Sequence, residues 1–315
     1  MEKNKLSVNE LLKYENELKS ATDNPCAYFL SPKTDYTKDE LSSLLGYFLS
    51  TSYDLTLLKE TIRAINDLRH EKNIDDLIDF LMSKTFDSSY DSNEVINLKT
   101  LCIKAISNFK DTKCIPALLY CLNDKSANYK MRFQAAEALG KIGDKNAVES
   151  LINVVSDEEE KSVYVRESAA VALGMIGDMR AIDPFLTILE AKKNFLDKFT
   201  FLKERVIEAL GKINFHSTGR VITAFKNALE DDSSQVRINA IECLMNSGAD
   251  EAYSLIKSKL LDKDEEVVRN AVIALYNLKG REALFEILRD DEMPEAAKFE
   301  ADEIYREYEE EIDDQ

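Results

Sequence analysis

Histidine and cysteine carry much of the nucleophilic and metal-binding chemistry of proteins, and both are scarce in this chain of 315 residues. A Ser-His-Asp or Cys-His nucleophile needs a histidine beside the attacking group. The two histidines, His70 and His216, are far apart in the sequence, and each stands near the end of a separate helical pattern. The sequence therefore predicts no catalytic triad, and we interpret His70 as an exposed residue favoured by a helix C-terminus.

The five cysteines are too irregularly spaced for a disulfide framework or a zinc site. Cys114 and Cys121 share one predicted helix and Cys102 lies in the preceding one, but no CxxC or CxxxH spacing accompanies them. Zinc sites normally show such paired spacing. We interpret these thiols as small buried core residues.

Nucleotide and calcium sites also lack their motifs. Neither GxxxxGK[ST] nor GxGxxG occurs, and the acidic run at residues 157–160 is not part of an oxygen-ligand loop. Carboxylates are abundant, but no pair stands out from the charged background. The sequence predicts a protein that is not an enzyme and that uses no cofactor and no metal.

The elements that must position any site come from one repeated unit. Residues 132–155 read RFQAAEALGKIGDKNAVESLINVV and residues 166–189 read RESAAVALGMIGDMRAIDPFLTIL, so the pattern recurs after 34 residues (166 − 132). Weaker copies bring the number of units to seven, and self-similarity at this period is typical of helical solenoids. The anchoring apolar residues of the seven units are Leu68, Ile106, Leu139, Leu173, Leu210, Leu244 and Leu275.

Each unit is predicted to be a pair of antiparallel helices. Ala169, Ala172 and Leu173 fall on one helical face, Gly177 suits a left-handed C-cap, and Asp178 can cap the next helix. A pair of this size cannot bury its own apolar face, so it must stack on its neighbours.

The expected fold is all-α: a right-handed α-solenoid (superhelix) of about seven antiparallel helix pairs with capping helices at both ends. Residues 1–34 are expected to form an N-terminal capping helix and loop. Residues 35–279 form the repeat solenoid, and residues 280–315 form C-terminal capping helices and an acidic tail. From residue 290 onward the chain has 13 acidic residues against two basic ones.

These repeats resemble the HEAT-like repeat family, especially the short repeats of phycobilin lyases and of many adaptor proteins. The resemblance covers about 240 of the 315 residues. It implies that the second helix of each unit lines a concave surface and that the protein binds other proteins, as most of the family does. His70 and Glu71 resemble one His-Glu pair of the deoxyhypusine hydroxylase family, which needs several such pairs where this chain has one.

If the concave face bound nothing, its positions on the second helices should be polar, but many of them are apolar. Counting Arg132 and Arg166 as position 0, the outward positions are +1, +2, +5 and +9. An apolar stripe rimmed by charge is typical of a protein interface. The predicted protein-binding residues on the concave face are Ile62, Leu101, Phe133, Glu137, Glu167, Val171, Met175, Arg205, Glu208, Ile238, Glu242 and Ile273. The alternative is that adjacent second helices cover these side chains.

Two longer segments between helices, Lys84–Val95 and Lys193–Phe201, carry aromatic residues. These rings either form a second binding surface or fold back over nearby helices, and we favour folding back because exposed aromatic clusters promote aggregation.

Charge and hydropathy limit the classes of partner that the chain is expected to bind. The chain has 41 Lys and Arg against 59 Asp and Glu, a net charge of −18. Nucleic-acid binding requires clustered cations, so no nucleic-acid partner is expected, and the acidic charge favours a basic protein or peptide. No apolar stretch approaches the ~20 residues of a membrane span, and the N-terminus MEKNKLSVNE has no signal-peptide core. We expect a cytoplasmic protein without membrane association.

The functional hypothesis is a non-catalytic scaffold or adaptor that binds a partner through the concave face. The alternative implied by the resemblance is a phycobilin-lyase-like subunit that handles a chromophore or acts as a chaperone. A HEAT-like DNA glycosylase is disfavoured, since it would need a basic, aromatic concave surface. The sequence leaves the oligomeric state open.

Overall fold

The computed structural model describes residues 37–190, 200–213 and 219–313, without the side chains of residues 200 and 307–313. Over these ranges the chain forms 16 α-helices, four short 3-10 helices and no strand, which confirms the all-α prediction. The chain divides into unit 1, up to Val154, and unit 2, from Val155 onward. The predicted N-terminal capping helix, Cys26 and His216 lie outside the described residues.

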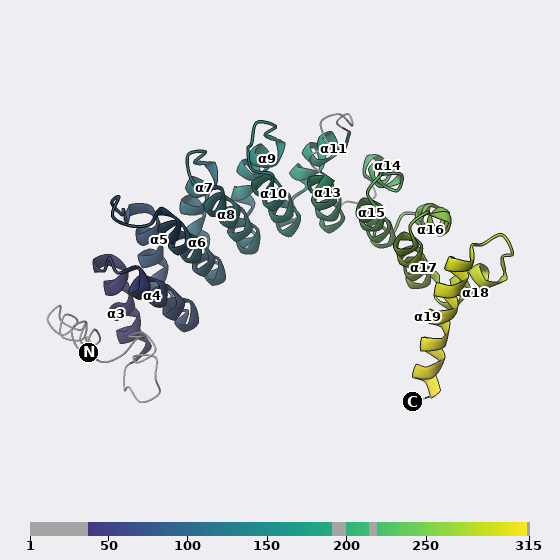
Figure 1. The fold of residues 1–315 in the computed structure, drawn as a ribbon, viewed down its shortest axis with the longest axis horizontal. Helices are drawn as coiled ribbons and strands as arrows, with labels where there is room; N and C mark the ends of the chain where they lie inside the picture. Colours follow the sequence, from purple (N-terminus) through teal and green to yellow (C-terminus); the bar gives the residue numbers. More distant parts are fainter. Residues whose placement is uncertain (1–36, 191–199, 214–218, 314–315) are drawn as a thin grey trace. The chain divides into compact units, whose positions relative to one another are not determined.

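Unit 1 consists of helix pairs that stack in two layers (Figure 1). The second helices α4, α6 and α8 pack in succession, and the first helices α3, α5 and α7 form the other layer. The elements are α3 (Lys38–Thr51), α4 (Leu55–Leu68), α5 (Asn73–Ser83), α6 (Ser92–Phe109), η1 (Thr112–Cys114), α7 (Ile115–Asn123), α8 (Tyr129–Ile142), η2 (Lys145–Ala147) and α9 (Val148–Ser156), whose last two residues belong to unit 2.

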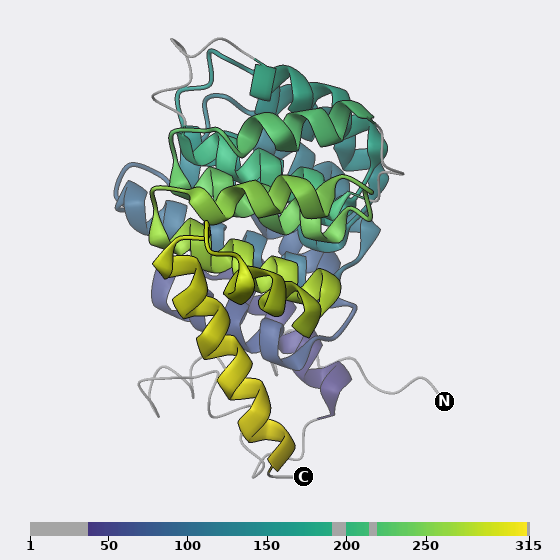
Figure 2. The same ribbon diagram turned by 90° about the vertical axis from the view of Figure 1, so that its right-hand side faces the viewer.

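Unit 2 continues the same alternation. The second helices α10, α13, α15 and α17 pack in succession, while α11 and α14 lie in the first-helix layer. The elements are α10 (Val163–Ile176), η3 (Met179–Ala181), α11 (Ile182–Glu190), α13 (Thr200–Lys212), α14 (Gly219–Ala228), α15 (Ser234–Asn246), α16 (Ala252–Lys257), η4 (Ser258–Leu261), α17 (Glu265–Lys279), α18 (Arg281–Arg289) and α19 (Glu295–Asp313). Figure 2 shows α19, in yellow, lying against α17 and α18, as expected for a terminal cap.

The turns within the repeats follow the predicted capping chemistry. Gly143 and Gly177 end α8 and α10 in the left-handed conformation, with φ of 77° and 69°. Asp144 and Asp178 then accept hydrogen bonds from backbone amides two residues further on, at 2.7 and 3.0 Å. These aspartates cap the 3-10 turns that lead into the first helices α9 and α11, so the sequence fixes the reversal of the chain locally.

A buried arginine links the two helices of a repeat. Arg132 donates from Nε to the carbonyl oxygen of Leu122, near the end of α7, at 2.9 Å. The side chain is 4% exposed, and the positive charge faces carbonyl groups that the preceding helix leaves without an intrahelical donor. The recurring arginine therefore serves packing within the repeat rather than an external ligand.

Glycine and alanine allow the second helices of unit 2 to approach closely. A Cβ atom on Gly174 of α10 would lie 2.8 Å from Cα of Ala209 on α13, and one on Gly211 would collide with Sγ of Cys243 on α15. Such spacing needs residues without bulk at the crossing. The alanine-rich seam predicted at Ala169 and Ala172 is fully buried.

The anchor assigned to the earliest repeat is wrong by three residues. Leu68 is only half-buried at the end of α4, whereas Ile65 is completely buried. The left-handed residue after α4 is Arg69, equivalent to Gly177 after α10, which places Ile65 in register with Leu173. Both ends of α4 carry leucine at helical spacing, so the apolar pattern alone admitted two registers.

The aromatic segment between α5 and α6 folds back onto unit 1, in agreement with the prediction that its rings cover nearby helices. Phe86 lies between Tyr53 and Tyr90, with ring centroids 6.0 and 5.3 Å apart respectively. Lys84 is buried beneath them and donates from Nζ to the carbonyl oxygens of Leu49 and Ser50, at 3.2 and 2.8 Å. This cluster caps the end of α3. Most of the other segment, residues 193–201, lies outside the described residues.

No helix in the described part of the chain combines the length and apolar character needed to cross a membrane.

Candidate functional site

Within the described ranges of the chain, the cysteines are buried and the histidine is engaged in a structural contact. Cys102, Cys114 and Cys121 are free and buried, and burial raises the pKa of Cys114 to about 12 and that of Cys121 to about 11. Thiols held in the protonated form are poor nucleophiles, which confirms their interpretation as core residues. His70 is half-buried, not exposed as expected, and its Nε2 lies 3.4 Å from Oδ1 of Asp39. Among the described residues, no cluster of His, Cys, Asp or Glu is placed to hold a metal ion.

The predicted binding residues fall into three groups by exposure. Exposed side chains are Arg205, Glu242, Met175 and Ile273, the last two at 48% and 38%. Half-buried side chains are Leu101, Phe133, Glu137, Glu167, Val171 and Glu208. Buried side chains are Ile62 and Ile238, at 0% and 5% exposure. Ten of the twelve therefore have accessible surface on a second helix.

Ile62 and Ile238 do not belong to an accessible face. The corrected register of α4 places Ile62 at position +4, which is a core position in every repeat. Ile238 occupies position +1 of α15, where Arg237 and Ala240 on the same helix are also buried. Neighbouring helices therefore cover position +1 of α15, as expected under the alternative, whereas Lys59 and Arg269 at position +1 of α4 and α17 remain exposed.

The best-defined accessible cluster lies on two adjacent helices of unit 2. We call it the α10–α13 patch: Glu167, Val171, Met175, Arg205, Glu208 and Lys212. Val171 and Met175 lie four residues apart on α10 and supply its apolar centre. The close crossing at Gly174 and Ala209 holds α10 against α13 and so brings the charged residues of α13 beside these two side chains.

The charges of the α10–α13 patch form an ordered network. Glu208 accepts from Arg205 at 2.9 Å and from Lys212 at 2.6 Å, one cation on each carboxylate oxygen. Burial alone would raise the pKa of Glu208, but the hydrogen bonds from Lys212 and Arg205 outweigh it and lower that pKa. Burial raises the pKa of Glu167, which Arg205 opposes and Glu204 reinforces. The patch thus offers charged groups of both signs around an apolar centre.

Unit 1 offers a cleft of about 400 Å³ on its second-helix face, between α4 and α6. The predicted residue Leu101 lines this cleft. Lys59 and Arg63 of α4 line it as well, and the sequence analysis missed them. In the corrected register they occupy outward positions +1 and +5, so the pattern Leu58, Ile62 and Ile65 at i, i+4 and i+7 could have revealed them. Other lining residues are Leu55, Thr56, Glu94, Asn97 and Leu98.

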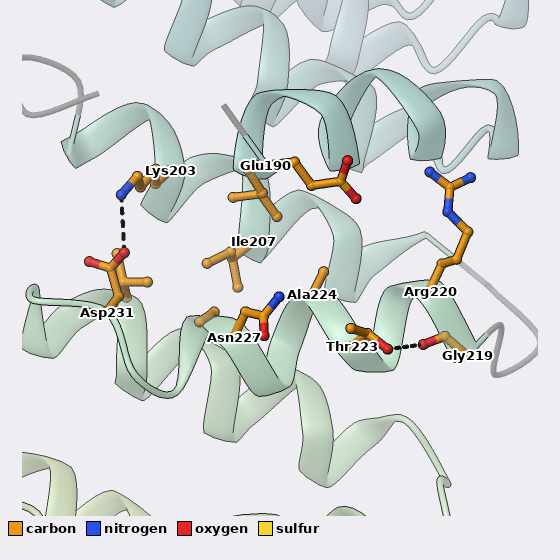
Figure 3. A pocket seen from close by; sticks show the side chains of 12 residues that line it. Glu190, Lys203, Ile207, Gly219, Arg220, Thr223, Ala224, Asn227 and Asp231 are labelled. Carbon is orange, nitrogen blue, oxygen red and sulfur yellow. Dashed lines mark hydrogen bonds and ion pairs between the residues drawn. The ribbon is translucent and has the colours of Figure 1, made fainter. Parts of the chain in front are cut away.

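A second cleft, of about 280 Å³, lies in unit 2 on the side of the first helices α11 and α14 (Figure 3). Ile207 of α13 and Val236 of α15 contribute to its apolar lining. Glu190, at the end of α11, and Asn227 of α14 lie on opposite sides of it. None of the predicted binding residues lines this cleft.

The solved structure of one known protein agrees with this architecture, and two further solved structures are more distantly similar. Among solved structures, the E. coli protein YibA is 19% identical with a TM-score of 0.51, over 97% of this chain and 100% of that chain. The CpcE–CpcF complex of phycocyanin lyase from Nostoc sp. is 21% identical, with a TM-score of 0.44 over 87% of this chain and 95% of that chain. Human deoxyhypusine hydroxylase is 16% identical, with a TM-score of 0.36 over 87% and 97%. At these identities the likeness concerns the fold alone.

A comparison with curated proteins gave no match. The family model for HEAT repeats, in contrast, matches four overlapping stretches, residues 90–163, 125–199, 195–277 and 222–298. Together these stretches run from residue 90 to residue 298, well over half of the 315 residues, and they contain α6 to α18. The chain therefore belongs to the HEAT-repeat family.

Proposed function

We propose that this HEAT-repeat protein is a non-catalytic scaffold or adaptor that binds a partner protein through the second-helix face, with the α10–α13 patch as its main docking surface in unit 2. The observation that carries the proposal is the exposure of Met175 beside Val171 at the centre of a charged network. Met175 and Val171 together form a small apolar centre rimmed by charged residues, and flexible methionine suits a binding surface.

The charge of the chain indicates the chemistry of the partner. Glu167 and Glu208 are balanced within the patch by Arg205 and Lys212, so the preference for a basic partner comes from the net charge of −18 on the whole chain. Like charges across an interface are unfavourable, while opposite charges speed association. The partner is accordingly a basic protein or peptide segment with an apolar side chain that covers Val171 and Met175.

A pair of matched methionine variants tests the proposal. Met175 and Met179 are 48% and 55% exposed, but Met175 belongs to the α10–α13 patch and Met179 to the 3-10 turn that begins the next repeat. Affinity capture with the wild-type protein, followed by mass spectrometry, identifies the partners. Met175→Asp should weaken capture of the relevant partner about tenfold or more, because it buries a charge in an apolar contact. Met179→Asp should leave capture unchanged. Equal capture by both variants would show that the patch is not the docking surface.

A further inference from the structure

The cleft between α11 and α14 is lined by both apolar and charged side chains. Leu189 and Ala224 supply its accessible apolar lining, and Ile207, Ala228 and Val236, which also border it, are almost completely buried. Ala224 and Ala228 lie four residues apart on α14, so two short side chains border the space that larger residues would fill. The second helices α13 and α15 are drawn together at Gly211 and Cys243, whereas the first-helix layer leaves this gap open.

The cations that line the cleft already have carboxylate partners. Lys203 pairs with Asp231 at 3.1 Å, as Figure 3 shows, and Arg220 pairs with Asp183 at 2.7 Å. Within the described residues, the carboxylate of Glu190 has no such partner, although Glu190 lines the same cleft. The charges of the lining residues sum to zero, Glu190 and Asp231 against Lys203 and Arg220, and Asp183, which pairs with Arg220 from outside the lining, brings the local charge to −1. The net charge of the whole chain is −18.

The cleft also offers an uncharged acceptor opposite Glu190. The side-chain amide of Asn227 has no hydrogen-bond partner in the part of the chain that the structure describes, and it lies on the α14 side of the cleft (Figure 3). Its carbonyl oxygen can accept from an N–H group. A ligand with an apolar stem and a cationic head can pack its stem against the apolar lining and donate from its head to these two acceptors. An anion would instead meet Glu190 and the negative field of the whole chain.

We propose that this cleft receives a lysine or arginine side chain of a bound basic protein segment. The alkyl stem lies along Leu189 and Ala224, and the cationic head binds the Glu190 carboxylate and the Asn227 side-chain carbonyl. The site is formed by the first-helix layer and lies apart from the α10–α13 patch. Its test is therefore independent of the test of the docking surface proposed above.

A comparison of two small probes tests the chemistry directly. N-acetyl-lysine methylamide carries the stem and the ammonium group, whereas N-acetyl-norleucine methylamide carries the stem alone. In a titration of the full-length protein with labelled leucine and alanine methyl groups, the lysine probe should shift the NMR signals of Leu189 and Ala224, which line the cleft and are partly accessible. It should bind about fivefold or more tightly than the norleucine probe, the factor that one ion pair contributes. No shift of these signals, or equal binding of the two probes, would overturn the proposal.

Substitution of Glu190 tests whether this residue binds the cationic head of the lysine probe. Glu190→Gln should reduce the affinity for the lysine probe to that for the norleucine probe, while the matched exposed substitution Glu251→Gln should leave it unchanged. Ala224→Leu, which fills the cleft, should remove the binding of both probes. Unchanged discrimination between the probes in Glu190→Gln would contradict the assigned role, and because Glu190 is exposed, this variant does not depend on repacking the core.

Discussion

Arg166 donates a hydrogen bond from Nε to the backbone carbonyl oxygen of Val155, at a distance of 3.0 Å, and the arginine side chain is almost completely buried. The bond joins α10 to the end of α9. Arg237 makes the equivalent contact from NH1 to the carbonyl oxygen of Asp231, at 2.8 Å, and pairs with Asp262 at the same distance. The repeat signature thus encodes a connection between consecutive helices.

Removing this connection should destabilise unit 2. In Arg166→Ala the carbonyl of Val155 loses its donor and a cavity remains, so the free energy of unfolding should fall by about 2–3 kcal/mol. The control Arg269→Ala removes an arginine that is largely exposed, and it should cost at most about 0.5 kcal/mol. Urea unfolding followed by circular dichroism measures both. Equal losses in the two variants would mean that burial of Arg166 has no special role.

Gly174 should tolerate no side chain. A Cβ there would lie 2.8 Å from Cα of Ala209, and backbone atoms cannot move aside as a flexible side chain can. Gly174→Ala should therefore lower the free energy of unfolding by about 2 kcal/mol through overpacking. The matched change Gly219→Ala meets open space at the start of α14 and should be neutral or slightly stabilising. Thermal unfolding distinguishes the two, and a neutral Gly174→Ala would show that the α10–α13 crossing can relax.

The stability of unit 1 should depend on the protonation of Asp76. Burial, followed by smaller repulsive effects of Asp79 and Asp75, raises the pKa of Asp76 above its ordinary value near 3.8, although the hydrogen bond from Asn73 opposes the shift. The folded state therefore retains a proton that the unfolded state has already lost, and stability decreases as pH rises from about 4 through the raised pKa.

Asp76→Asn removes this titration and keeps an oxygen that can accept from Asn73. Its stability relative to wild type should be lowest near pH 3 and should increase as pH approaches 7. The control Asp67→Asn replaces an exposed carboxylate and should show a constant difference over the same range. Urea midpoints at pH 3, 5 and 7 measure the trend, and a relative stability that falls with rising pH would reverse the assignment.

The chromophore-handling alternative makes a separate prediction. A linear tetrapyrrole carries two propionate groups, and a chain with net charge −18 disfavours an anionic ligand. Mixing the protein with phycocyanobilin should leave the visible absorbance spectrum of the bilin unchanged. A saturable red shift would support the lyase-like function and weaken the scaffold proposal.

The sequence predicted the fold because the local signals agree with one another. Gly177 ends α10, Asp178 caps the following turn, and Ala169 and Leu173 define the buried face, so each residue independently indicates the same helix pair. Where these local signals were missing, the register of the repeat could not be predicted correctly. Neither a glycine nor a capping aspartate follows α4, where Arg69 adopts the left-handed conformation before His70, and the register of that repeat was misassigned together with Ile62. After α6, where Lys110 stands in place of the glycine, Asp111 still caps the next turn, and the anchor Ile106 was predicted correctly.

The clefts could not be predicted from the sequence. Their existence depends on how far neighbouring helices diverge, which follows from small volume differences at Ala224 and Ala228 and from the longer connection before α6. Exposure of Met175 and burial of Ile238 likewise depend on how adjacent repeats cover outward positions. These are tertiary effects that the periodicity of a single repeat does not contain.

Photo-crosslinking from two exposed methionine positions tests the central claim most directly. A benzophenone amino acid placed at Met175 probes the second-helix face, and the same group at Met179 probes the 3-10 turn that begins the next repeat. If the second-helix face docks the partner, position 175 should give a specific crosslinked product, identified by mass spectrometry, and position 179 should give none. A product from position 179 alone would contradict the account.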